Sequence, residues 1–154
     1  MIKINVTLNN ISWKKNLKDP NSYIKKKVLL INKKNKLFKK NILTCTLLLS
    51  NTLEIKKLNK KFRNKDKSTD VLSFPFNEKK KFKNEVKKKK KIYLGDIIIN
   101  LNKITNRKNK LKFEDEFNKL WIHGLVHLFG YKHKTDKDFL LMNRLEKIIL
   151  KQIS

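Results

Sequence analysis

The three histidines of this chain all lie in one short segment, H-G-L-V-H-L-F-G-Y-K-H, and no other occurs in its 154 residues. Because residues four apart share one face of an α-helix, His123 and His127 can present two imidazoles to one ion. Gly130 supplies the left-handed conformation that commonly closes a helix, so the chain can turn back and bring His133 to the same point. The segment therefore predicts a helix that ends in a tight reversal beside a three-histidine metal site.

Gly124 separates this motif from that of the metzincin proteases. Those zinc enzymes share the spacing H-E-x-x-H-x-x-G-x-x-H, and their Glu is the general base that activates water for peptide hydrolysis. Three nitrogen ligands still leave a fourth position for water, as in catalytic zinc sites. We therefore favour a zinc hydrolase with one ion per chain. Three alternatives stay open: a protease with a base elsewhere, metal-free histidines in the core and loop, and a closed site with Cys45 as fourth ligand.

The hydrophobic pattern predicts an α+β fold, in one domain over residues 1–154 with a small sheet flanked by helices. Apolar and polar residues alternate over Ile2–Leu8, as expected for a half-buried strand. Further strands are predicted at 42–49, 71–76 and 92–99, and helices at 22–37, from 51 or 52, from about 102, at 114–129 and from 135.

Three features of the pattern carry more specific expectations. Pro75 cannot donate a ladder hydrogen bond, which favours the edge of the sheet for its strand. Gly95 within a strand predicts a bulge or a close backbone approach, and we expect that strand to line the functional cleft and to pair with an extended substrate. The lysine-rich segment 77–91 is expected to be a solvated loop that is dispensable for folding, because like charges at that density repel.

The charge of the chain favours a polyanionic partner. Its 40 Lys and Arg residues against 13 Asp and Glu give a formal net charge of +27, and 37 of the 40 are lysine. A domain this basic attracts nucleic acid and loses affinity steeply as salt rises. A genome biased toward A and T produces the same excess of Lys, Asn and Ile, so a drifted and merely solvated surface remains the alternative.

The sequence also predicts where the protein resides. Its longest apolar runs, such as residues 97–99, fall far short of the ~18–20 residues that span a membrane. The N-terminus lacks the roughly 7–15-residue apolar stretch of a secretory signal. Cys45 is the single cysteine, which excludes an intrachain disulfide and any multi-cysteine metal site. We therefore expect a cytoplasmic protein with no membrane contact.

Several blocks of the sequence together resemble one family. These are residues 58–75, which include T-D-V-L-S-F, then L-G-D-I at 94–97, then the three-histidine segment. In this order they resemble the YbeY family, bacterial single-domain endoribonucleases that are also called rRNA maturation factors. The resemblance covers about residues 42–150. It implies a small mixed four-stranded sheet flanked by helices, with a zincin-like active-site helix. It further implies a zinc-dependent, single-strand-specific endoribonuclease that acts on the 16S rRNA precursor in 3′-end maturation and on ribosomal subunits in quality control.

The same resemblance implies roles for individual residues. By match to the family motif, His123, His127 and His133 are the zinc ligands, and Arg63 is the arginine that faces the cleft. A planar, always charged guanidinium stabilises the charge that develops on phosphate better than a lysine does. Arg63 is one of only three arginines, although an ion pair with Asp66 or Asp70 is the alternative explanation.

The chain departs from the family pattern at one position. The family usually has G-Y-D-H at the third histidine, whereas this sequence has Lys132 in place of the Asp. If that Asp orients His133 or offsets the charge of the metal, zinc affinity should be lower here. We expect Asp70 and Ser73 to be structural. The rival function is a ribosome-associated RNA-binding factor whose zinc is only structural.

Overall fold

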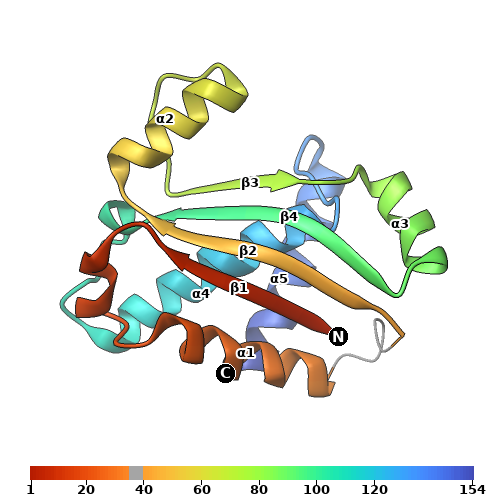
Figure 1. Cartoon of the computed structure of the whole chain (residues 1–154), viewed down its shortest axis with the longest axis horizontal. Helices are drawn as coiled ribbons and strands as arrows, with labels where there is room; N and C mark the ends of the chain where they lie inside the picture. Colours follow the sequence, from red (N-terminus) through yellow and green to blue (C-terminus); the bar gives the residue numbers. More distant parts are fainter. Residues whose placement is uncertain (35–39) are drawn as a thin grey trace.

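The computed structural model describes residues 1–34 and 40–154, which form a small α+β domain around a mixed four-stranded sheet (Figure 1). The sheet has the strand order β1-β2-β4-β3. β1 (Ile2–Leu8), β2 (Ile42–Ser50) and β4 (Lys91–Asn100) run parallel, and β3 (Val71–Pro75) pairs antiparallel with β4. The predicted fold class is confirmed. Pro75 lies on an edge strand, as its missing N–H predicts.

Helices cover the two faces of the sheet unequally. α1 (Pro20–Lys34), α4 (Lys110–Leu128) and α5 (Asp136–Ile153) enclose the main core on one face, and Figure 1 shows α4 and α5 behind the sheet. On the other face, α2 (Thr52–Arg63) covers one end of the sheet through a small cluster of Ile55, Leu72 and Ile98. The remaining elements are α3 (Lys79–Lys88) and the short 3-10 helices η1 (Ile11–Lys15) and η2 (Leu101–Lys103).

The helix starts follow from local side-chain chemistry. Asn51, Asn109 and Thr135 each accept a hydrogen bond from a backbone N–H in the first turn of α2, α4 and α5. Such caps satisfy amides that have no partner within the helix. Thr135 was expected to start the last helix, and α4 begins four residues before the predicted 114. The described helices include none with the length and apolarity needed to cross a membrane.

The segment 77–91 is not the solvated loop that its charge predicts. Residues 79–88 form α3, whose Phe82 is buried and packs near Phe129, with a ring-centroid distance of 5.9 Å. The amide of Asn41 holds the end of the helix by donating to the carbonyls of Val86 and Lys89, each at 2.8 Å. Phe82 and Val86 are four residues apart and share one face, so two apolar residues outweigh the surrounding lysines.

Three other expectations need correction or restriction. The helix predicted from about 102 is only the 3-10 turn η2, because the carboxylate of Glu116 binds the backbone N–H of Thr105 at 2.8 Å and holds the following chain in a loop. The predicted 22–37 helix is α1, and residues 35–37 of the prediction lie outside the described residues. Gly95 does form a bulge, but β4 is paired on both sides, so it has no free edge for a substrate strand.

α4 approaches the sheet unusually closely at Gly124. A Cβ atom placed on this glycine would lie 2.6 Å from Cγ2 of Ile97 and 3.2 Å from Oγ of Ser73. Ile97 is a fully buried, β-branched residue of β4, so its methyl group has little room to move. The glutamate of the protease motif could not occupy this position without displacing the helix. Gly124 is therefore a packing requirement of the fold.

We predict that Gly124→Ala destabilises the protein by about 1–3 kcal/mol, because the added methyl group overpacks the contact with Ile97. Chemical denaturation of both proteins measures this difference. An alanine inside a helix is ordinarily favoured over glycine by about 0.5–1 kcal/mol, so a stabilised variant would contradict the close approach.

We also predict that the thiol of Cys45 does not react with iodoacetamide in the folded protein. Cys45 is fully buried on β2, and burial raises the pKa of its thiol to about 12, so the reactive thiolate is absent at neutral pH. Mass spectrometry after labelling should find modification only in denaturant. Rapid labelling of the native protein at pH 8 would show that β2 opens readily.

Candidate metal centre and cleft

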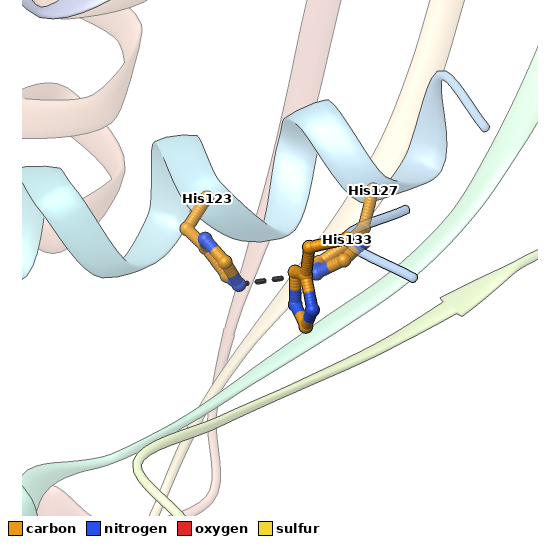
Figure 2. Close-up of side chains that lie close together, drawn as sticks. All are labelled: His123, His127 and His133. Atoms are coloured by element: carbon orange, nitrogen blue, oxygen red, sulfur yellow. Dashed lines mark hydrogen bonds between the residues drawn. The ribbon is translucent and has the colours of Figure 1, made fainter. Parts of the chain in front are cut away.

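The three histidines converge at the C-terminal end of α4. His123 and His127 project from its last two turns, and His133 comes from the loop that follows (Figure 2). One nitrogen from each ring lies within 4.8 Å of the other two. His123 and His127 are half-buried, whereas His133 is exposed. The structure thus brings together the three residues that the sequence motif singles out.

A turn at Gly130 brings the chain back toward α4. Gly130 has a φ of +85°, and its backbone N–H donates to the carbonyl of His127 at 2.8 Å. A Cβ at this position would lie 2.7 Å from Cα of Lys79, so α3 packs directly against the turn. Only glycine combines this φ with so close an approach. The next residue, Tyr131, uses its carbonyl to fix the ring of His127.

Hydrogen bonds fix the orientation of two imidazoles. Nδ1 of His127 lies 2.8 Å from the carbonyl oxygen of Tyr131, and Nδ1 of His123 lies 2.8 Å from Oε1 of Glu146 on α5. A carbonyl and a carboxylate only accept, so both Nδ1 atoms carry the proton and both Nε2 lone pairs are left for an ion. Burial lowers the pKa of His127 and keeps its ring neutral, which is the metal-binding form.

The spacing of these nitrogens suits a zinc ion. Nε2 of His123 and Nε2 of His127 are 3.1 Å apart, and Figure 2 marks this contact. Two ligand nitrogens on a tetrahedral zinc, each about 2.0–2.1 Å from it, are separated by about 3.3 Å. Lone pairs that face each other at this distance repel unless a cation lies between them. The donor set therefore fits a metal with three imidazole ligands and room for a further one.

The histidines form one wall of a cleft with a volume of about 510 Å³. Arg63, at the end of α2, also lines this cleft, so the structure places it in the same cleft as the three imidazoles. Lys132 and Lys134 add two more cations, and Asp70 contributes the one carboxylate among the lining residues. The complete lining is Arg63, Thr69, Asp70, Val71, Ser73, Pro75, His123, His127, Tyr131, Lys132, His133 and Lys134.

The structure decides between several sequence-based alternatives. Cys45 is buried in the main core and does not line the cleft, so it is not a fourth ligand. Asp66 pairs with Lys56 and Lys60, and within the described residues Arg63 has no ion pair. The guanidinium is therefore available to a ligand in the cleft.

Asp70 and Ser73 lie in the cleft, on the segment that leads into β3 and on β3 itself. Oδ1 of Asp70 accepts from the backbone N–H of Val71 at 2.8 Å and from the hydroxyl of Thr69 at 3.0 Å, contacts that hold the local backbone. Ser73 stands beside Gly124, where α4 meets the edge strand.

Sequence reasoning missed Glu146. Its carboxylate is the partner of His123, and its side chain is only 22% exposed. One signal could have indicated it: after the first turn of α5, Glu146 is the single acidic residue of that helix, and Leu145 and Ile149 beside it pack on the core. A carboxylate next to core residues needs a hydrogen-bond partner, but the partner of Glu146 is far away in sequence.

We predict that Glu146→Gln lowers zinc affinity about 10- to 100-fold, because a neutral amide holds the His123 ring less firmly and makes its Nε2 less basic. Competition with a chromogenic chelator measures the affinity. Asp115→Asn, which removes an exposed carboxylate from α4, is the matched control. Equal affinity in both variants would show that Glu146 does not support the site.

Comparisons with known proteins agree with this geometry. Residues 7–154 match the family model described as Endoribonuclease YbeY. The chain is 44% identical to Endoribonuclease YbeY from Pelagibacter ubique over 99% of this chain and 97% of that protein. It is 39% identical to the Nautilia profundicola protein of the same name, over 80% and 83%. The solution structure of TM1509 from Thermotoga maritima superposes with a TM-score of 0.59 at 26% identity, covering 98% of this chain and 89% of that one.

The family model spans nearly the whole chain, and the two curated relatives share the name under which the model is described. The three-histidine cluster and the cleft arginine lie within the matched residues. This protein belongs to the YbeY family of endoribonucleases.

Proposed function

We propose that this protein is a zinc-dependent endoribonuclease that cuts single-stranded RNA in the three-histidine cleft. The observation that carries the proposal is the shared cleft, which both Arg63 and the three histidines line. Phosphodiester cleavage needs an activated water and a stabilised phosphate, and these two groups match the two needs.

His123, His127 and His133 would hold one zinc ion per chain, which supplies a Lewis acid for the hydrolysis of phosphodiesters. Glu146 and the carbonyl of Tyr131 keep the first two rings in place by hydrogen bonds to Nδ1. These contacts leave the binding nitrogens free before any ligand arrives. The site is therefore preorganised by protein groups from α4, α5 and the loop between them.

Arg63 would bind the phosphate. Its guanidinium carries a permanent charge in a planar fork that matches two phosphate oxygens, and no described carboxylate neutralises it. Lys132 and Lys134 add positive charge on the same lining, which favours an anionic strand. Lys132 stands where the family usually has Asp, and Glu146 supplies a carboxylate contact to His123.

The biological setting is proposed on the family relationship. The substrate would be the 16S rRNA precursor, cut in late 3′-end maturation, with ribosomal subunits as partners in quality control in the cytoplasm. The net charge of +27 suits such a polyanionic substrate. The rival, an RNA-binding assembly factor with a structural zinc, needs a closed metal site, whereas the three histidines lie on the wall of an open cleft.

We predict that the purified protein cleaves a labelled single-stranded rRNA fragment only when loaded with zinc. Arg63→Ala should lower the cleavage rate on the order of 100-fold, because it removes a charged donor to the phosphate. Arg63→Lys should recover little of the rate, since an ammonium lacks the planar fork. His127→Ala should lose both metal and activity. Gel analysis of the products with metal quantification gives these results.

Arg107→Ala, which removes an exposed arginine outside the cleft, is the matched control. Circular dichroism should show that all variants are folded. Stoichiometric zinc in a wild-type protein that binds RNA without cutting it would contradict the nuclease and support the assembly factor.

A further inference from the structure

Two aromatic pairs, each with a well-exposed phenylalanine, adjoin the cleft. Phe62 of α2 contacts Phe74 of β3 with ring centroids 5.5 Å apart, and Phe76 contacts Tyr93 of β4 at 5.8 Å. Phe62 is 59% exposed and Phe76 is 68% exposed. Rings of this size that remain exposed in pairs on a highly charged surface call for a binding explanation.

These pairs adjoin the lining of the cleft along the chain. Phe62 directly precedes Arg63, and Phe74 and Phe76 flank Pro75; both Arg63 and Pro75 line the cleft. Side chains alternate across a strand, so Ser73 and Pro75 face the cleft while Phe74 lies on the face of the sheet that carries α2. A strand of RNA that crosses the β3 edge at the cleft would therefore meet these rings next.

The surroundings of the pairs favour nucleobases over a protein surface. Tyr93 donates to Asp96 at 2.5 Å and lies 3.2 Å from the hydroxyl of Thr46, so its ring is held in place among polar groups. The ammonium of Lys61 lies 5.2 Å from the ring centroid of Phe62. The core of a protein–protein interface is depleted of charged residues, whereas Lys61 lies against the ring of Phe62. An exposed ring beside a cation, as at Phe62, matches a strand of stacked bases and phosphates.

Figure 1 shows that this face of the sheet has no helix across its middle, beyond the end that α2 covers. Phe74 and Phe76 are two residues apart, and the backbone N–H of Phe76 still pairs with Leu94 at 2.8 Å, which continues the ladder beyond β3. The two residues are therefore about 7 Å apart along the strand direction. Because Phe62 packs on Phe74 and Phe76 packs on Tyr93, the two pairs follow one another along β3.

We propose that Phe62 and Phe76, with Phe74 and Tyr93 behind them, form a base-stacking site for the single-stranded RNA next to the scissile phosphate. The proposal rests on the proposed function for its substrate, single-stranded RNA. It adds that the protein selects unpaired strands through their bases, since bases in a duplex have no free face to offer.

The test measures binding of a short 2′-O-methyl oligonucleotide, and of the same strand without bases, to the zinc-loaded protein by fluorescence anisotropy. The double variant Phe62→Leu/Phe76→Leu keeps apolar side chains but removes two rings. We expect it to bind the base-containing strand about tenfold or more weakly than wild type, and the abasic strand equally well. Phe139→Leu, at a comparably exposed phenylalanine of α5 that does not line the cleft, should change neither affinity.

Each other outcome overturns the stacking site. Equal losses for both strands would mean that the phenylalanines act through the fold and do not stack on bases. Unchanged affinity for both strands would mean that the rings do not touch bases and would leave a protein partner as their explanation. Because only binding is measured, the result tests the stacking site whether or not the protein cuts RNA. Cleavage by Phe62→Leu/Phe76→Leu can be measured separately.

Discussion

The contact between α4 and the sheet at Gly124 is the constraint on which the rest of the site depends. The absence of a side chain lets α4 pack closely against Ile97 and Ser73. This close approach sets the position of His123 and His127 relative to the edge strand. The same close approach brings the helix end to the turn at Gly130. A larger residue would lift the helix and move the two imidazoles away from their places in the cleft that Arg63 also lines.

Periodicity predicts the regular parts of this fold because they follow local rules. Ile2–Leu8 alternates, residues 114–128 repeat at helical spacing, and Asn51 and Thr135 cap helices as their side chains allow. The sequence did not predict α3 as a helix, because lysines dominate that segment. The two apolar residues that decide its conformation contact residues of the folded core, which are distant in sequence. Local pattern carries no information about such distant burial.

The metal site likewise has parts that the sequence predicts and parts that it does not. The three histidines and the glycine of the turn lie in one short segment, so their convergence could be predicted from spacing alone. Glu146 could not be found so, since its contact with His123 spans the loop between two helices and depends on how α5 packs. The role of Arg63 was inferred from a family resemblance, and the structure places this residue in the same cleft as the histidines.

The dispersal of the cleft along the chain also has a consequence for synthesis. Arg63 ends α2, His123 and His127 end α4, and the carboxylate that steadies His123 belongs to the last helix. Contacts between such distant segments form late, because the intervening loops must close first. A ribosome makes the chain from its N-terminus, so the cleft is completed only when α5 emerges and docks. A partly made chain that lacks α5 therefore also lacks the carboxylate that orients His123.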